Sequence, residues 1–527
     1  MMLKFKSAAA VLLQPQVLKG LLVSGIVLSG LTLALPTQAQ TADSIRANAE
    51  ASLTAFNIPG MAVVAVKDGK VILAEGFGVR DIASGEPVTA DTLFGIASNT
   101  KAFTAAAIAT LVEQGKLHWN DRVIEHIPEF RLADAAITRE LTIADLLSHR
   151  SGLGLGAGDL MIWPNTDKST ADLLAGLAHV PIESGLRERF HYNNLMFVVA
   201  GEVVARVSGM PYNDYIKQTF FKPLGMTATT LGYSNIPASN QNRAVGTIEM
   251  NGELHQFPLD YLEDFAGAGA IASNAKEFGA WLQTQLNAGK SPAGEQLFSA
   301  QSQQQMWQLM TPLPVPASAA AVGTHFRGYG LGWFVKNYHG VKHVSHSGGI
   351  LGMLSLTTII PEHNFAITVF SNQQAFNGLT VVTEEALEDL LGLPDKDWLA
   401  SEQTAYSEFM QSKATFKVPT PALVREPLPI PAYVGGYKDA WYGDVRITEQ
   451  DGRLRMSFAH TELLKGTLEH YNGDTFIVRW DEPLLEADAF VEFRVAPNNQ
   501  VLGANMQAVA DFTDFSFDFH NLKLVKQ

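Results

Sequence analysis

Ser98 and Lys101 lie three residues apart where an Ala-rich segment, residues 100–117, begins. Apolar side chains recur there with helical spacing and predict a helix, in which residues i and i+3 share a face. A serine becomes a nucleophile when a neighbour takes its proton, and a desolvated lysine is neutral enough to do so. The free N–H groups at a helix start also favour a developing oxyanion. A serine cap followed by a surface lysine would look the same, so the pair alone decides nothing.

Tyr192 and Asn194 stand just before a second segment with helical spacing, residues 195–207. A phenol held near a lysine can share in general-base catalysis, and an asparagine side chain can hold the amide of a substrate. The same residues also fit a buried tyrosine followed by an asparagine that caps a helix. Alone, this pair leaves both interpretations open.

His346, Gly348 and Gly349 belong to a short H-S-G-G run that ends one strand-like segment and precedes another, residues 354–360. Glycines let a backbone approach a ligand closely. An N–H group from this edge could pair with that of Ser98 as an oxyanion hole. The alternative is a glycine turn between two strands with an exposed histidine.

Motifs for other chemistry are absent from the sequence. There is no G-x-S-x-G elbow, H-E-x-x-H zinc helix, Walker loop or EF-hand loop, and there is no cysteine. We therefore expect no metal and no cofactor, and disulfides and thiolate chemistry are excluded.

The three signals occur in the order S-x-x-K, Y-x-N, H-x-G, separated by about 90 and 150 residues. This order resembles the penicillin-recognising serine hydrolases, the superfamily of class C β-lactamases, D-Ala-D-Ala peptidases, D-aminopeptidases and related esterases. The resemblance covers about residues 45–395. It includes four further motifs: L-L-S-H-R-S-G-L at 146–153, P-L-G-M at 223–226, G-A-G-A at 267–270 and Y-G-L-G-W at 329–333.

The resemblance implies a covalent mechanism. Ser98 would attack a carbonyl and form an acyl-enzyme that water later releases, while Lys101 and Tyr192 handle the proton. Asn194 would orient the substrate, and the backbone N–H groups of Ser98 and Gly349 would stabilise the oxyanion. The implied catalytic residues are Ser98, Lys101 and Tyr192, and the implied substrate-binding residues are Asn194, His346, Gly348 and Gly349.

One position departs from the commonest lactamase pattern. Where many relatives have Lys-Thr-Gly, this chain has His346 followed by Ser347 and Gly348. Lysine is a cation near pH 7, whereas histidine is mostly neutral there. We expect weaker recognition of a substrate carboxylate, a less favoured phenolate, and a larger share of the base role for Lys101.

The predicted function is an exported serine hydrolase that cleaves amide or ester bonds of small-molecule or peptide substrates. The histidine favours a peptidase or esterase over an efficient β-lactamase. The alternative from another class is a non-hydrolysing, acyl-accepting penicillin-binding sensor, which would keep Ser98 but fail to release the acyl group.

The resemblance implies an α/β (α+β) serine β-lactamase-like fold, and the elements around these residues point to the same kind of architecture. Two β-branched runs, residues 61–66 and 71–74, flank a D-G turn and predict a hairpin, and strand-like alternation returns at 354–360 and 366–370. The chain between residues 118 and 310 reads mostly as helices broken by loops. We therefore predict an antiparallel sheet from both chain ends, flanked by helices, with a helical subdomain.

Five prolines between residues 419 and 431 predict an extended spacer. Beyond it, short alternating runs separated by turn residues predict an all-β barrel or sandwich that resembles a lipocalin-like domain. The runs are residues 445–447, 454–458, 476–480, 490–495 and 515–519. The predicted divisions are residues 1–39, a signal peptide; 40–400, the serine hydrolase domain; 401–431, a linker; and 432–527, the barrel.

The N-terminus indicates export to the periplasm or the medium. Three lysines precede an uncharged apolar run of 15 residues, 21–35, and Thr37 and Ala39 put small residues at the two positions that a signal peptidase would inspect before the expected cleavage site. A retained membrane anchor is the alternative, although about 20 residues are needed to span a bilayer. We expect no membrane span after cleavage.

The charge of the chain limits its partners. A net charge of −15 makes nucleic acid an unsuitable partner. The sequence does not fix the oligomeric state.

Overall fold

The computed structural model describes residues 38–257, 263, 265–321 and 323–527. The chain divides into two units, residues 1–35 and 36–527, and the described residues belong to the second. The predicted signal peptide lies outside the described residues except for Gln38 and Ala39, which begin helix α1 (Gln38–Ala55).

An antiparallel sheet of eight strands, in the order β2-β1-β13-β12-β11-β10-β9-β8, forms the centre of the larger domain. It combines the predicted hairpin with the predicted later strands, so the sheet is built from both ends of this domain, as expected. Its strands are β1 (Gly60–Lys67), β2 (Lys70–Gly78), β8 (Thr311–Leu313), β9 (Arg327–Tyr329), β10 (Phe334–Tyr338), β11 (Val341–Ile350), β12 (Met353–Ile360) and β13 (Phe365–Ser371).

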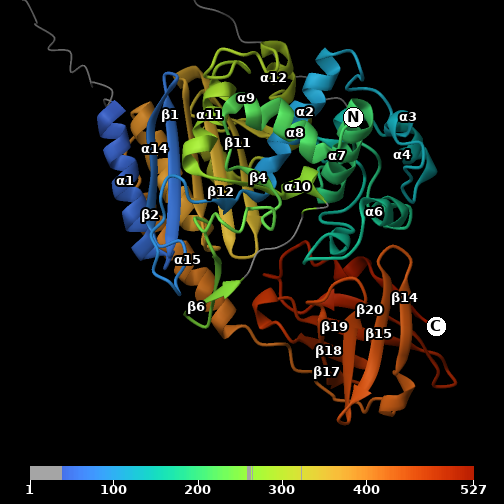
Figure 1. Cartoon of the computed structure of the whole chain (residues 1–527). Coiled ribbons are helices and arrows are strands. Elements are labelled where there is room, and N and C mark those ends of the chain that lie inside the picture. The colour runs from blue at the N-terminus through green and yellow to red at the C-terminus, as the bar shows by residue number, and fades with distance from the viewer. Residues whose placement is uncertain (1–37, 258–262, 264, 322) are drawn as a thin grey trace, which may run out of the picture. The chain divides into compact units, whose positions relative to one another are not determined.

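Alternate residues of β1 supply two separate cores, because successive side chains of a strand point to opposite faces of its sheet. Met61 and Val63 pack in a cluster with α1 and α14 (Phe376–Leu391), and these two helices lie together on one side of the sheet (Figure 1). Ala62 and Val64 belong to the cluster on the other face, with α11 (Ala275–Leu286). The strand is therefore buried on both sides.

Between β2 and β8 the chain is mainly helical, as predicted, but it also contains short strands. The helices nearest the predicted site residues are α2 (Thr100–Glu113), α7 (Asn194–Ser208) and α10 (Ala266–Gly269), which pack against one another. The others are α3 (Val123–His126), α4 (Ala135–Glu140), α5 (Ile143–Leu146), α6 (Thr170–Leu177), α8 (Tyr212–Ile216), α9 (Lys222–Leu224), α12 (Ala300–Met306) and α13 (Ala317–Ala321). The strands are β3 (Phe94–Gly95), β4 (Thr230–Leu231), β5 (Gly246–Met250), β6 (Glu253–Phe257) and β7 (Ile271–Ser273).

The C-terminal strands close into an eight-stranded antiparallel barrel, which confirms the predicted all-β domain. Alternate side chains such as Val445 and Ile447 are buried inside it. Its strands are β14 (Gly435–Asp439), β15 (Gly443–Gln450), β16 (Arg453–Phe458), β17 (Lys465–Asn472), β18 (Thr475–Trp480), β19 (Ala489–Val495), β20 (Val501–Ala508) and β21 (Lys523–Lys526).

The predicted linker, residues 401–431, is partly helical. Helix α15 (Trp398–Thr415) crosses its first half and packs on α14 through Trp398, Leu399 and Tyr406. Residues 416–429 form neither helix nor strand, so the extended spacer is confined to the proline-rich part of the segment.

The strand predicted at residues 515–519 is wrong. Alternating phenylalanines suggested one buried face, but residues 516–519 are all buried, whichever way they would point in a strand. The segment turns instead: the side chain of Asp514 accepts a hydrogen bond from the Ser516 N–H at 2.8 Å, and the 3₁₀ helix η7 (Phe519–Asn521) follows. Its polar side chains are buried because the hydrolase-like domain packs against this loop.

Among the described residues, no single helix has the length and apolar composition needed to cross a membrane. Helix α7 and the segment Tyr212–Leu224 meet that requirement only as a pair, across a bend of 77°.

Candidate active site

Ser98 lies in a strained turn at the start of α2. The turn is the 3₁₀ helix η1 (Ala97–Asn99), and Ala97 has φ +49°, a conformation that costs energy for a residue other than glycine. The side chain of Asn99 donates to Ser355 Oγ at 2.7 Å, which in turn donates to the carbonyl of Ile96. These bonds hold the turn against β12, and the Ser98 side chain is left half-exposed.

Lys101 is completely buried, and its amine faces Ser98. Nζ lies 2.9 Å from Ser98 Oγ, 2.8 Å from Asn194 Oδ1 and 2.7 Å from the carbonyl oxygen of Ala268 in α10. Burial lowers the pKa of Lys101 to about 7, although the negative charge of Asp159 acts in the opposite direction. The neutral form of Lys101 is therefore populated near pH 7, and the neutral amine can accept the proton of Ser98.

Tyr192 completes the predicted triplet. Its hydroxyl hydrogen-bonds with the Ser98 side chain, and its ring centroid lies 5.0 Å from Lys101 Nζ. The ring also packs against the His149 ring, from the L-L-S-H-R-S-G-L motif, at a tilt of 34° and with centroids 4.2 Å apart. Burial raises the pKa of Tyr192 well above its ordinary value, so the phenol is neutral near pH 7.

Asn194, the first residue of α7, bridges Lys101 to a buried carboxylate. Its Oδ1 accepts from Lys101 and its Nδ2 donates to Asp159 Oδ2 at 2.8 Å. One N–H of the amide is thus engaged by Asp159, and the amide has a second N–H that can donate to a ligand. Asp159 begins the 3₁₀ helix η2 (Asp159–Met161), and burial raises its pKa to about 7.

The H-S-G-G run lies inside a single strand, β11, and does not end one. His346 is buried: its Nδ1 lies 2.6 Å from the Ser347 carbonyl and its Nε2 lies 2.8 Å from the Tyr329 hydroxyl. Because a carbonyl only accepts, Nδ1 carries the proton and Nε2 accepts from the phenol. Burial lowers the pKa of His346 to about 3. The alternative of an exposed histidine is therefore wrong, and this edge supplies no cation.

Strand β11 passes directly against the backbone of the nucleophile. A Cβ on Gly348 would lie 2.2 Å from the Ile96 carbonyl oxygen and 3.0 Å from the Ser98 nitrogen, so only glycine fits. Gly349, the next residue, lines the same pocket as Ser98. The backbone is thus placed for the oxyanion hole, whose Ser98 and Gly349 donors stay a prediction.

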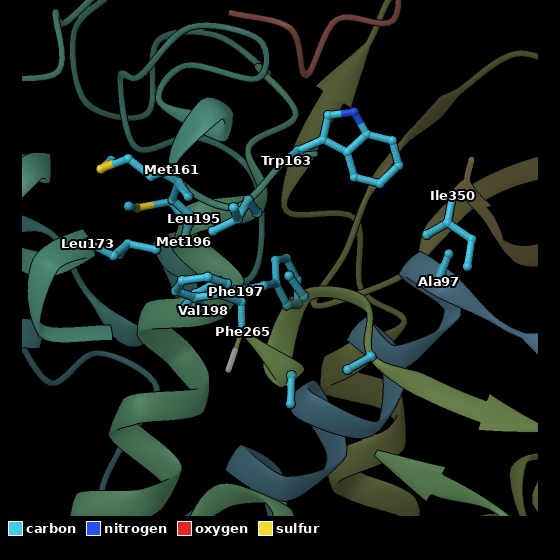
Figure 2. Close-up of a cluster of buried hydrophobic side chains, with 14 of the residues drawn as sticks. Ala97, Met161, Trp163, Leu173, Leu195, Met196, Phe197, Val198, Phe265 and Ile350 are labelled. Carbon is cyan, nitrogen blue, oxygen red and sulfur yellow. The ribbon is translucent and has the colours of Figure 1, made fainter. Parts of the chain in front are cut away.

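A pocket of about 320 Å³ opens at Ser98. Tyr192, Asn194, His346 and Gly349 line it with Ser98, and Ala97, Trp163 and Ile350 contribute apolar surface. Figure 2 shows the indole of Trp163 between the side chains of Met161 and Leu195 on one side and Ile350 on the other. The predicted site residues, far apart in the sequence, therefore meet around one small cavity.

The barrel supplies part of the pocket wall. Asp514, Phe515 and Ser516 line it, and the Phe515 ring meets the Tyr192 ring edge to face at 6.0 Å. Ser516 Oγ donates to Asp159 Oδ2 at 2.9 Å. Two segments that have no part in the sequence motifs, the η2 loop and the barrel loop at residues 514–518, thus connect to Lys101 through Asn194.

Comparison with known proteins agrees with this geometry. Residues 45–391 match the model of the Beta-lactamase family. The chain belongs to the Beta-lactamase family. Members of this family are generally serine hydrolases, and residues 421–526 match a domain of unknown function, DUF3471, which covers the barrel.

Relatives of this Beta-lactamase family protein span most of its length. The unguisins hydrolase ungD of Aspergillus violaceofuscus is 28% identical over 81% of this chain and 80% of its own. An octameric penicillin-binding protein homologue from Pyrococcus abyssi has a similar structure, with a TM-score of 0.59 and 22% identity over 92% of this chain and 99% of its own. The D-amino acid amidase from Ochrobactrum anthropi SV3 matches with a TM-score of 0.55 and 22% identity over 66% of this chain and 99% of its own.

Proposed function

We propose that this Beta-lactamase family protein cleaves amide or ester bonds of small substrates through an acyl-enzyme on Ser98. The observation that carries the proposal is the contact of 2.9 Å between Lys101 Nζ and Ser98 Oγ, with the pKa of that lysine lowered to about 7. A neutral amine at that position is a general base within reach of the proton it must take.

In acylation, Ser98 Oγ bonds to the substrate carbonyl carbon while its proton passes to Lys101 Nζ. The negative charge on the carbonyl oxygen is stabilised by the backbone N–H groups of Ser98 and Gly349. The bond to the leaving nitrogen or oxygen then breaks, and the leaving group takes a proton from the neutral phenol of Tyr192, which regains one from Lys101.

In deacylation, a water molecule attacks the ester formed on Ser98. Lys101 accepts a proton from that water, the carbonyl carbon–Oγ bond breaks, and the proton returns to Oγ. The products are a carboxylic acid and the free serine, and both Ser98 and Lys101 regain their starting protonation states.

The pocket favours apolar substrates without a carboxylate. Among the described residues that line it, Asp514 carries the only charged side chain, and Trp163, Phe334 and Phe515 give aromatic surface. The neutral His346 stands where many relatives have a lysine, so no cation meets a substrate carboxylate. These features favour a peptidase or esterase over an efficient β-lactamase.

We also propose that the protein is exported to the periplasm or the medium. The basic residues, apolar run and small residues of the first 39 positions support this proposal. Expression of the full chain, followed by N-terminal sequencing of the extracytoplasmic fraction, tests it. Protein that stays in the cytoplasm with its first residues intact would contradict export.

A chromogenic short-chain ester, a D-amino-acid amide and a cephalosporin test the proposed function. We expect continuing turnover of the ester or amide, slow cephalosporin hydrolysis, and a kcat/KM that rises with pH through about 7, because Lys101 must be neutral. Ser98→Ala should abolish acylation, whereas Ser401→Ala, an exposed serine on α15, should keep full activity. Undiminished turnover by Ser98→Ala, or one sub-stoichiometric burst from the wild type, would refute the proposal.

A further inference from the structure

Asp159 has no part in the steps above, yet it is a fully buried carboxylate beside the catalytic residues. Its Oδ2 accepts hydrogen bonds from Asn194 Nδ2 at 2.8 Å and from Ser516 Oγ at 2.9 Å. Among the described residues, its Oδ1 has no hydrogen-bond partner. Burying a carboxylate is costly unless it is paired, so its presence here calls for a specific task.

A carboxylate at this position can fix the orientation of the Asn194 amide. An amide has an accepting end and a donating end, and it can be turned over to exchange them. The ammonium form of Lys101 only donates and so requires the oxygen of Asn194, whereas a carboxylate only accepts and so requires the nitrogen. With Lys101 at 2.8 Å on one side and Asp159 at 2.8 Å on the other, a single orientation satisfies both.

The barrel holds Asp159 from the opposite side. Besides the Ser516 hydroxyl, Asp518 Oδ2 accepts from the N–H of Gly158, the residue before Asp159, at 2.6 Å. A continuous chain of hydrogen bonds therefore runs from Ser98 through Lys101, Asn194 and Asp159 to Ser516. Its last member belongs to the C-terminal domain.

The charged groups around this chain of hydrogen bonds determine how each of its members affects the pKa of Lys101. The titratable groups that face it are His149, Tyr192, His346, Asp514 and Asp518. Burial lowers the pKa of both histidines and raises that of the tyrosine, so these three are neutral near pH 7. Burial raises the pKa of Asp518 to about 8. Ionised Asp159 raises the pKa of Lys101, and the Ser516 hydroxyl favours the ionised form of Asp159.

We propose that Asp159 is a positioning residue that orients Asn194 toward Lys101, and that Ser516 of the barrel completes this arrangement. The inference rests on the proposed role of Lys101 as general base. It makes the active site of the Beta-lactamase family domain dependent on one hydroxyl group from the C-terminal domain.

Three variants separate charge from orientation, with the pH dependence of ester kcat/KM as the readout. Asp159→Asn keeps an acceptor but removes the charge, so the acidic limb should move to lower pH with a loss in kcat of about tenfold or less. Asp159→Leu removes both, so the same shift should come with a loss of about 100-fold. Ser516→Ala should shift the limb in the same direction by less, because Asp159 is then ionised less often.

Two controls are available, one in the barrel loop and one directly before it. Ser516→Thr keeps the hydroxyl and should restore the wild-type limb. Thr513→Ala removes a hydroxyl that bonds to the carbonyl of Glu486 within the barrel, at 3.2 Å, and should leave both kcat and the limb unchanged.

An unshifted limb in both Asp159→Asn and Ser516→Ala would overturn the inference. If the Asp159 variants fail to fold, Ser516→Ala, which removes a single oxygen atom, decides alone. The proposed function fails separately, by turnover in Ser98→Ala or by the absence of a wild-type limb near pH 7. If the wild type shows the acidic limb near pH 7 and Ser98→Ala is inactive, the proposed function stands. Asp159 and Ser516 variants with the same limb as the wild type would then contradict only the role of these two residues.

Discussion

Lys101 and Tyr192 both lie against Ser98, and their pKa values shift in opposite directions for the same reason. Burial disfavours a charge, so it lowers the pKa of the lysine to about 7 and raises that of the tyrosine. At an unperturbed pKa near 10, about one tyrosine in a thousand is ionised at pH 7, and here the fraction is smaller. Of the two groups, Lys101 is the one that can take the proton of Ser98 near neutral pH.

Replacing Tyr192 with Phe tests this division of roles. Proton delivery to the leaving group is lost, so kcat should fall by about 10²-fold or more. The acidic limb of kcat/KM should stay near pH 7, because it reports Lys101. A pH series with one ester measures both quantities. If the limb disappeared in Tyr192→Phe, the phenol would be the base and the assignment to Lys101 would be wrong.

At the scale of single residues, the motifs predicted the side chains that surround Ser98 but not Asp159, which holds one of those side chains from the far side. Lys101, Tyr192 and Asn194 stand at motif positions, and the structure brings them together. Asp159 belongs to no motif, and its role depends on burial and on a partner more than 350 residues away, Ser516. Spacing along a chain carries no information of that kind.

Strand β11 positions the oxyanion edge through the close approach of its backbone to Ser98. The structure predicts different outcomes for its two glycines. A methyl group on Gly348 would lie 2.2 Å from the Ile96 carbonyl oxygen, whereas one on Gly349 would meet only Leu354, at 3.4 Å.

Gly348→Ala should therefore lower the melting temperature by about 1–3 °C, as expected for a loss of about 1–3 kcal/mol from overpacking in a unit of this size. Gly349→Ala should leave the melting temperature close to that of the wild type. Thermal unfolding followed by circular dichroism compares the two variants. Equal melting temperatures would show that β11 does not press on the Ser98 turn.

At the scale of elements, β-branched and alternating runs predicted four of the eight strands of the main sheet, β1, β2, β12 and β13, and four of the eight barrel strands, β15, β16, β18 and β19. The prediction from alternation failed at residues 515–519, where Phe515, Phe517 and Phe519 imitate an alternating strand. The intervening Ser516 and Asp518 are buried as well, by contact with another domain. Local patterns do not record which residues a second domain will cover.

The two domains share one continuous apolar core. A single cluster of buried side chains runs from α2 and α7 to barrel residues such as Tyr433 and Trp441. The backbone of Trp441 approaches Gly176 of α6 so closely that a Cβ there would lie 2.8 Å from its carbonyl oxygen. Asp167 and His460 add a contact of 2.7 Å across the same boundary.

This continuity predicts that residues 36–527 unfold as one unit. Differential scanning calorimetry should give a single transition whose calorimetric and van't Hoff enthalpies agree. Gly176→Val, which forces the barrel and α6 apart, should lower the transition temperature. Two resolved transitions in the wild type would mean that the barrel is an independent module, which would also weaken the case for Ser516 in the active site.

The most direct measurement is the site and pH dependence of labelling by an active-site fluorophosphonate, read by peptide mapping in a mass spectrometer. Phosphonylation of Ser98 alone is expected, at a rate that rises through pH values near 7 and that collapses in Lys101→Met. A label on another residue, or undiminished labelling without the lysine amine, would contradict a serine nucleophile activated by its buried neighbour.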